Sequence, residues 1–224
     1  MKKAVIFDLD GTLLNTLEDL RTAVNLALCA SGYPARTLEE TRLAVGNGIR
    51  KLIARSVPAG IPPEAEEVVF VRFREEYSLH CSDTTAPYAG VPELLWRLRE
   101  EGFLLAVVSN KADFAVQKLA EQYFPGCFDA VLGEIEGLSR KPAPDMVEEV
   151  LRRLGTKKEE AVYVGDSEVD VATARNAGLS CISVTWGFRE RAVLEEHGAA
   201  CFADNIEELY AAVKEGGNSR KYSS

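Results

Sequence analysis

Phe7-Asp8-Leu9-Asp10-Gly11-Thr12-Leu13-Leu14-Asn15-Thr16 is the stretch that decides the fold, and it follows the apolar run Ala4-Val5-Ile6. Residues i and i+2 of a strand share a face, so Asp8 and Asp10 begin on one side of the chain. Gly11 lets the backbone turn sharply and bring main-chain amides around a group held by Asp8. An Asp-Gly pair alone indicates only a polar turn after a strand. The second aspartate and Thr12 instead favour a site where one carboxylate attacks and the other handles protons.

Length and composition exclude several classes of protein. The 224 residues suit one α/β domain, or a core domain with a modest insertion. Hydrophobic residues make up 46% and charged residues 27%, and no apolar stretch approaches the ~20 residues that a membrane helix needs. We therefore expect no membrane insertion. Met-Lys-Lys and the short apolar run after it lack the features of a secretory signal, so we expect a cytoplasmic protein.

Charge and cysteine content narrow the possible partners. A net charge of -9 and a pI near 4.9 argue against nucleic acid, which requires basic patches. An anionic substrate would need local attraction from a metal ion and one or two basic side chains. The five cysteines are scattered and form no CxxC pair, so the sequence indicates neither a disulfide framework nor a zinc site. We expect a small-molecule partner.

Strand and helix patterns alternate after residue 100. Apolar, β-branched runs predict buried strands at 103–108, 130–132, 161–164 and 181–184, with a weaker one at 201–202. Apolar residues at helical spacing predict helices over 91–98, 116–123, 147–154 and 206–213. The alternation predicts an α/β fold, a Rossmann-like parallel sheet flanked by helices on both faces. Ligands of such sheets bind beyond the carboxyl ends of the strands.

Residues 16–84 interrupt this alternation and predict an inserted, all-helical cap. Helical spacing is present from Leu17 to Leu28 and from Phe70 to Tyr77, and Thr37 to Glu40 match a capping box. We expect residues 1–15 and 85–224 to form the catalytic core. The crossings near Asn15 and Ala86 are natural hinges, and the polar tail 216–224 is expected to be disordered.

Three more polar clusters follow predicted strands. Ser109 and Asn110 end the run 104–108, Lys141 opens a Lys-Pro-x-Pro stretch, and Asp166 and Asp170 follow the strand at 161–164. Each has a structural alternative: Ser109 as a helix cap, Lys141 as a solvated side chain, and Asp166 as the N-cap of the helix that Gly178 ends. Together the clusters supply a nucleophile, a proton donor, a hydroxyl, an ammonium and further carboxylates, which is the inventory of phosphoryl transfer.

The ordered set Asp-x-Asp-Gly-Thr, Ser-Asn, Lys-Pro and Gly-Asp-x-x-x-Asp resembles the haloacid dehalogenase superfamily over nearly the whole chain. The resemblance implies Mg²⁺-dependent phosphoryl transfer through an aspartyl-phosphate. Asp8 would be the nucleophile, and Asp10 the acid and then the base. Mg²⁺ would be held by the Asp8 side chain, the main-chain carbonyl of Asp10, and Asp166.

The remaining motif residues take supporting roles in this resemblance. Asp170 would lie behind the metal ligands and orient Lys141 or a metal-bound water. The substrate phosphoryl oxygens would be bound by Lys141, Ser109, Asn110 and the amides near Gly11 and Thr12.

Within the superfamily, a cap directly after the first motif resembles the phosphatases and mutases. Asp10 argues against dehalogenases and phosphonate hydrolases, and the absence of a His in 16–20 disfavours the mutases. The segment 45–50 resembles the specificity loop of phosphoglycolate phosphatases, as do 87–91 and 170–178, although Asn15 replaces the Asp of many relatives. Asn47, Gly48 and Arg50 are therefore candidate substrate contacts. Arg50 could bind a carboxylate bidentately or be a solvated helix residue.

Three functional interpretations remain open from the sequence. The first is a phosphatase for a small phosphorylated acid, 2-phosphoglycolate. The second is a pyrophosphatase or broad sugar-phosphate phosphatase of the same family. The third is a receiver-like signalling domain, which the cap and Asp10 disfavour because a receiver keeps its phosphoryl group. The sequence also leaves open whether the chain is a monomer or a homodimer.

Overall fold

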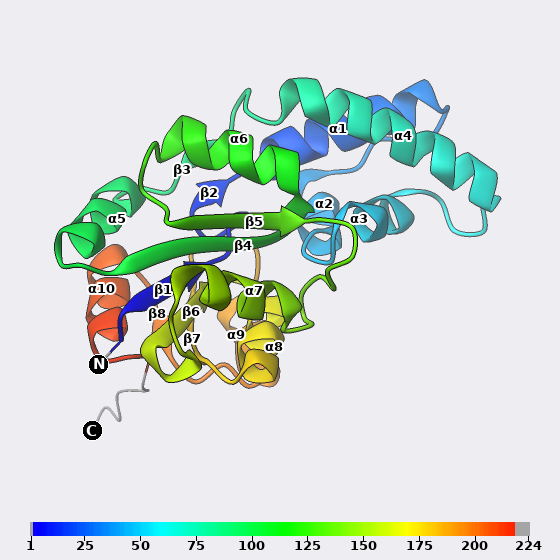
Figure 1. Ribbon diagram of the computed structural model, residues 1–224. Helices are drawn as coiled ribbons and strands as arrows, with labels where there is room; N and C mark the ends of the chain where they lie inside the picture. The colour runs from blue at the N-terminus through cyan, green and yellow to red at the C-terminus, as the bar shows by residue number, and fades with distance from the viewer. Residues whose placement is uncertain (1, 218–224) are drawn as a thin grey trace.

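A computed structural model describes residues 2–217 of the chain, so the expectation of disorder at 216–224 falls mostly outside the described residues. Six strands form one parallel sheet in the order β5-β4-β1-β6-β7-β8 (Figure 1). The predicted α/β fold with a parallel sheet is confirmed. The strands are β1 (Ala4–Phe7), β4 (Leu104–Ala112), β5 (Ala130–Glu134), β6 (Ala161–Gly165), β7 (Ser180–Val184) and β8 (Phe202–Ala203).

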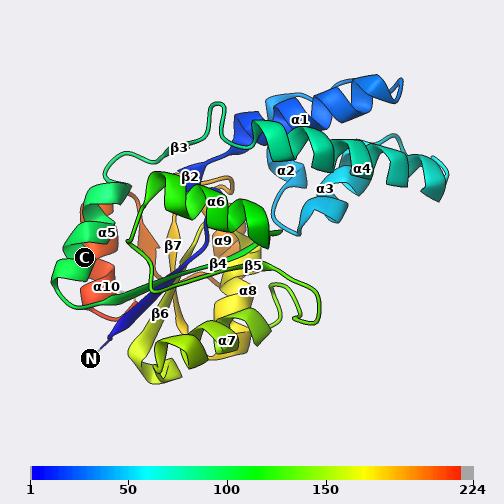
Figure 2. The same ribbon diagram turned by 45° about the horizontal axis from the view of Figure 1, so that its top comes forward.

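Helices cover both faces of this sheet, as the alternation predicts. In β1, Val5 and Phe7 pack into the hydrophobic cluster under α5, α6 and α10, whereas Ala4 and Ile6 pack into the cluster under α7 and α8 (Figures 1 and 2). All four β1 residues are fully buried, which is why the strand is uniformly apolar. The core helices are α5 (Val91–Glu100), α6 (Asp113–Tyr123), α7 (Asp145–Leu154), α8 (Glu168–Ala177), α9 (Arg191–Glu196) and α10 (Ile206–Lys214).

The strand order places the polar clusters at one edge. β1 lies between β4 and β6, and Phe7 is in register with Val107 on one side and Val164 on the other. The residues that follow these three positions therefore meet at the carboxyl ends of the strands, where the chain order changes direction around β1. β4 continues to Ala112 with a register shift after Val108, so Ser109 and Asn110 lie within its last part rather than beyond it.

The inserted residues form four helices with a hydrophobic cluster of their own. The capping box at Thr37 and Glu40 is present, and α4 begins at Pro63. The cluster is drawn from residues 17–81, together with Phe188 of the core. No described helix combines the length and hydropathy that a membrane crossing requires. The helices are α1 (Leu17–Ala30), α2 (Leu38–Ala44), α3 (Ile49–Ser56) and α4 (Pro63–His80), and they lie together beyond one end of the sheet (Figure 2).

The two crossings between the helical segment and the core pair with each other. β2 (Leu14–Asn15) and β3 (Ala86–Pro87) form a two-stranded antiparallel sheet. Next to it, the buried Asp19 carboxylate accepts hydrogen bonds from the amides and hydroxyls of Thr84 and Thr85, at 2.5–3.2 Å. Burial opposes the charged form of Asp19, but these hydrogen bonds lower its pKa below the usual value. The carboxylate therefore fastens the start of α1 to the returning chain.

We expect Asp19→Asn to reduce the free energy of unfolding by about 1.5–3 kcal/mol, because an amide nitrogen would face donors that now meet a carboxylate oxygen. Since the folded-state pKa is lowered, the contribution of Asp19 is present above the unfolded-state pKa of about 3.9 and is lost as pH falls below it. Urea unfolding of both proteins at neutral and acidic pH measures the difference. Glu18→Gln, an exposed neighbour on α1, is the matched control. A constant difference across this pH range would contradict the assignment.

Candidate active site

Asp8 follows β1 directly and lies at the bottom of a pocket. Its residue is 8% exposed, and one carboxylate oxygen accepts the Leu9 amide at 2.7 Å. Gly11 has a φ of +84°, and a Cβ built there would lie 2.3 Å from Oδ2 of Asp166, so only glycine fits this turn. The amides of Gly11 and Thr12 donate to the carbonyls of Leu14 and Leu9. These two amides are therefore already paired within the loop.

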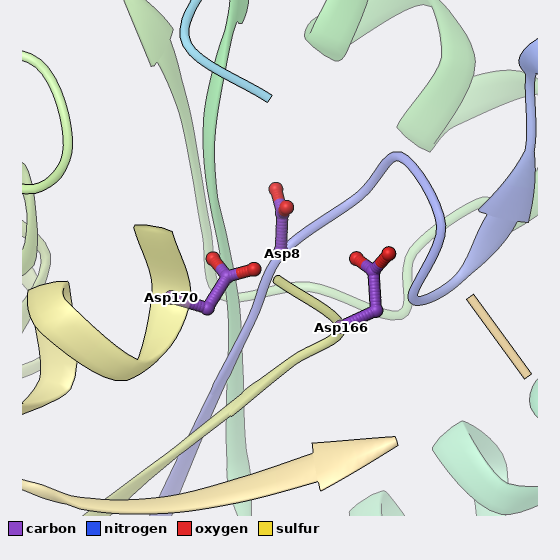
Figure 3. A group of neighbouring side chains, drawn as sticks. All are labelled: Asp8, Asp166 and Asp170. Carbon is purple, nitrogen blue, oxygen red and sulfur yellow. The ribbon is translucent and has the colours of Figure 1, made fainter. Parts of the chain in front are cut away.

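The carboxylates of three aspartates, Asp8 among them, lie together (Figure 3). Asp8, Asp166 and Asp170 come from the loop after β1, the end of β6 and the first turn of α8, and one oxygen of each lies within 4.8 Å of the others. Asp166 accepts from the Thr12 hydroxyl at 3.1 Å and from the Phe188 amide at 2.7 Å. Ser167, not Asp166, is the N-cap of α8. Asp170 lies in the same cluster, and its oxygens accept hydrogen bonds from Lys141, Tyr163 and Ser167.

Lys141 is the one cation that touches this cluster among the described residues. Its ammonium lies 2.9 Å from Asp8 and 2.8 Å from Asp170, and 3.1 Å from the Tyr163 hydroxyl. The residue is 3% exposed, so the solvated alternative for Lys141 does not hold. Ser167 donates its hydroxyl to the second Asp170 oxygen at 2.6 Å. Lys141 thus links two of the three carboxylates.

The cluster carries more negative charge than one ammonium balances. Burial raises the pKa of Asp8 to about 7; Asp170 and Asp10 act in the same direction, and Lys141 opposes them. Burial also raises the pKa of Asp166, aided by Asp170 and Asp8. For Lys141, burial favours the neutral form, but Asp170 and Asp8 raise its pKa above the usual value. The site therefore has three carboxylates and one ammonium. The carboxylates offer only oxygen ligands and an excess of negative charge, which a hard divalent cation prefers.

Asp10 has a different lysine. Both its oxygens accept from the Lys111 ammonium, at 2.6 and 2.8 Å, and Oδ1 also accepts from the Thr16 hydroxyl at 2.6 Å. The Lys111 side chain is only 4% exposed. Burial works against the ammonium, but the charges of Asp10 and Tyr77 raise its pKa. Our sequence-based reasoning missed Lys111, although it lies two residues after Ser109 and therefore on the same face of a strand.

A pocket lies between these charged groups and the helical segment. Its enclosed free volume is about 50 Å³, which is room for only a few water molecules. Seven of the predicted site residues line it: Asp8, Asp10, Gly48, Ser109, Asn110, Lys141 and Asp166. Lys111 and Arg189 line it as well, together with apolar side chains from both parts of the chain.

Arg50 and Asn47 lie outside this lining. The Arg50 side chain is 59% exposed, pairs with Glu67 at 2.6 Å and stacks over the Phe70 ring at 3.9 Å. Asn47 accepts from Arg55 at 2.8 Å. Arg50 belongs to α3, and its position matches the alternative of a solvated helix residue. The structure therefore does not bring the predicted carboxylate-binding arginine to the pocket.

Two arginines form reciprocal contacts between the core and the helical segment beside the pocket. Arg189 of the core donates to the carbonyls of Arg42 and Val45, at 2.9 and 2.6 Å, and pairs with Glu168 at 2.9 Å. Arg42 in turn donates to the carbonyl of Phe188. Arg189 had no signal in the sequence, because its burial depends on partners more than 140 positions away.

Asn110 adds a further contact across the same boundary. Its amide nitrogen donates to the carbonyls of Gly46 at 3.2 Å and Lys141 at 3.0 Å. Its Oδ1 is buried and has no hydrogen-bond partner among the described residues. A polar atom left unpaired at the pocket wall is available to a bound molecule.

Comparison with known proteins agrees with this geometry. Residues 5–184 match the family model of the haloacid dehalogenase-like hydrolases. The chain is 35% identical to a phosphoglycolate phosphatase of Cereibacter sphaeroides, over 92% of this chain and 96% of that protein. It is 32% identical to phosphoglycolate phosphatase 1 of Pseudomonas aeruginosa, over 93% and 79%.

A solved structure is similar over almost its whole length. A protein from Lactobacillus delbrueckii subsp. bulgaricus, provisionally assigned as a phosphoglycolate phosphatase, superposes with a TM-score of 0.91 at 39% identity, covering 95% of this chain and 99% of its own. The family match spans the acidic cluster, both lysines and the whole helical segment. On this evidence the chain belongs to the haloacid dehalogenase-like hydrolases, as an enzyme most similar to their phosphatases.

Proposed function

We propose that this enzyme hydrolyses phosphomonoesters through a phosphoryl group carried transiently on Asp8, and that 2-phosphoglycolate is its substrate. The observation that carries the proposal is the pairing of each carboxylate of the Asp8–Asp10 motif with its own buried lysine in one pocket. Because each aspartate pairs with a different lysine, the two carboxylates lie in different electrostatic environments. Such a difference is needed if one is to act as nucleophile and the other as acid and base.

The chemistry divides between these two residues. An oxygen of Asp8 attacks phosphorus and forms a P–O bond, while the bond from phosphorus to the ester oxygen breaks. Asp10 delivers a proton to that leaving oxygen. Asp10 then takes a proton from a water whose oxygen attacks phosphorus. The bond from phosphorus to the Asp8 oxygen breaks, which releases inorganic phosphate and restores the carboxylate. Asp8 and Asp10 return to their starting states, so atoms and protons balance over the cycle.

We infer a Mg²⁺ site at Asp8, Asp166 and the main-chain carbonyl of Asp10, with Asp170 behind these ligands and orienting Lys141. The fit rests on oxygen-only donors and on the uncompensated negative charge around Lys141. When bound, the cation reduces repulsion between Asp8 and the phosphoryl group. Lys141 and the hydroxyl of Ser109 would bind phosphoryl oxygens, which is supported by their position in the pocket lining. The amide nitrogen of Asn110 donates to the carbonyl of Gly46 in the loop of the helical segment.

The helical segment 16–84 would act as a cap over the core formed by residues 1–15 and 85–224. Support comes from its separate hydrophobic cluster and from its attachment through the β2–β3 pair. Its loop at Val45–Gly48 contributes to the pocket wall, so opening and closing would control access.

Support for 2-phosphoglycolate comes from the names of the similar proteins and from the cations that line the pocket. A turnover screen of phosphorylated metabolites with Mg²⁺, including pyrophosphate and hexose phosphates, tests the assignment. A preference for pyrophosphate or sugar phosphates would change the substrate assignment. Phosphorylation without turnover would instead indicate a signalling domain.

Asp8→Asn should reduce kcat on the order of 10⁴-fold or more, because an amide cannot attack phosphorus. The fold should persist, since the change removes a charge from a crowded acidic cluster. Acid quenching of the wild type during turnover should trap phosphorylated protein, and the variant should trap none. Substantial activity in Asp8→Asn would rule out the covalent route.

Asp10→Asn should lose on the order of 10²-fold in rate with alkyl phosphates. The loss should be smaller with p-nitrophenyl phosphate, whose leaving group departs without a proton. Steady-state rates on the two substrates give the ratio. Equal losses would show that Asp10 does not protonate the leaving oxygen.

Mg²⁺ should raise the melting temperature of the metal-free protein more at about pH 8 than at about pH 5.5. The raised pKa of Asp8, about 7, means that its stabilising protonated form is present at low pH and is lost as pH rises through that value. The cation replaces the lost proton. Thermal melts with Mg²⁺ and with chelator measure the increment, and Asp166→Asn should remove it. An increment independent of pH would contradict a site at these carboxylates.

A further inference from the structure

Three basic side chains line the pocket, and two of them are each bound to several groups. Lys141 bridges Asp8 and Asp170 on the side of the nucleophile. Arg189 uses Nε, Nη1 and Nη2 on Glu168 and on two carbonyls of the helical segment. Lys111 differs from both, because Asp10 is the only charged group paired with it among the described residues.

The position of the Lys111 ammonium is fixed by a strand and by buried contacts of its side chain. It belongs to the last part of β4, its side chain is 4% exposed, and the ammonium lies 5.0 Å from the centre of the Tyr77 ring on α4. The strand and the helical segment therefore enclose the ammonium at the junction between core and cap. The face of the ring attracts the ammonium and helps to keep it at the pocket wall.

The position of Asp10 defines where that anion would lie. In the proposed mechanism Asp10 contacts the leaving oxygen of the substrate. The Lys111 ammonium lies within 2.8 Å of both Asp10 oxygens, so it is also close to the atoms that follow the leaving oxygen. In 2-phosphoglycolate the carboxylate carbon is two bonds beyond that oxygen.

We propose that Lys111 binds the carboxylate of the substrate's leaving group and so selects α-phosphoryloxy carboxylates over uncharged phosphate esters. This inference rests on the proposed function and adds the residue that reads the non-phosphate end. Lys111 takes the role that the sequence suggested for Arg50, whose guanidinium pairs with Glu67 outside the pocket. The ammonium shifts from Asp10 toward the substrate, and no covalent change is involved.

The test compares 2-phosphoglycolate with 2-hydroxyethyl phosphate, which carries a hydroxymethyl group in place of the carboxylate. The ratio of kcat/KM values for the two substrates is the readout, because any effect of Lys111 on Asp10 itself acts on both. Lys111→Gln should lower this ratio at least about 10-fold, the scale of a hydrogen bond to a charged group. Lys111→Arg, which keeps the charge, should retain most of the ratio.

Two further variants make the comparison specific. Lys51→Gln removes an exposed lysine of α3 and should leave the ratio at the wild-type value. Arg50→Gln tests the competing cation and should also leave it unchanged. Thermal melts of all four variants identify loss of folding. If Lys111→Gln does not fold, Lys111→Met, which also removes the charge, takes its place in the comparison.

The outcomes separate this inference from the proposed function. A wild type that prefers 2-phosphoglycolate, with an unchanged ratio in Lys111→Gln, would overturn the role of Lys111 and leave the substrate intact. A collapse of the ratio in Arg50→Gln alone would return the role to Arg50. A wild type without preference for the carboxylate would overturn the substrate assignment and this role together.

Discussion

The buried contact of Lys141 with Asp8 and Asp170 is the interaction on which the rest of the site depends. Three carboxylates that approach within 4.8 Å repel one another, and burial removes the water that would screen them. One ammonium at 2.8–2.9 Å from two of them offsets part of this cost. Removing one partner of a buried ion pair leaves an uncompensated charge, which is why such a lysine cannot be replaced without consequence for its neighbours.

The parallel sheet explains how these charges can meet at all. Asp8, Lys111 and Asp166 stand at the ends of three adjacent strands, β1, β4 and β6. Each strand is buried on both faces, so its polar residues are confined to its end. The strand order brings these ends to one edge, and the apolar clusters on both faces hold them there. The packing that stabilises the fold thereby fixes the distances between the charged groups.

The sequence predicts most of the sheet because buried parallel strands are continuous apolar runs, as at Ala161–Gly165. It also predicts the acidic motif residues, since their spacing after strands is local. Lys111 and Arg189 escape such reasoning because a lone basic residue is usually solvated, and only tertiary partners reveal that these two are buried. Helix α3 was not predicted either, because its N-cap residue is Gly48, which has no side chain to signal the start of a helix. The segment 45–50 was therefore interpreted as a loop, with a solvated helix position as the alternative for Arg50, whereas the helix begins at Ile49.

The peptide units around Phe188 join the acidic cluster to the helical segment. The Phe188 amide donates to Asp166, its carbonyl accepts from Arg42, and its ring packs into the cluster of the helical segment. A cation held at Asp166 and a helical segment docked on the core through Arg42 would therefore share Phe188 as a common partner. Thermodynamic reciprocity then applies: to whatever extent cation occupancy tightens cap docking, cap docking tightens cation binding by the same factor. If Asp166 holds the proposed cation, its affinity would therefore depend on the docking of the helical segment as well as on the carboxylates.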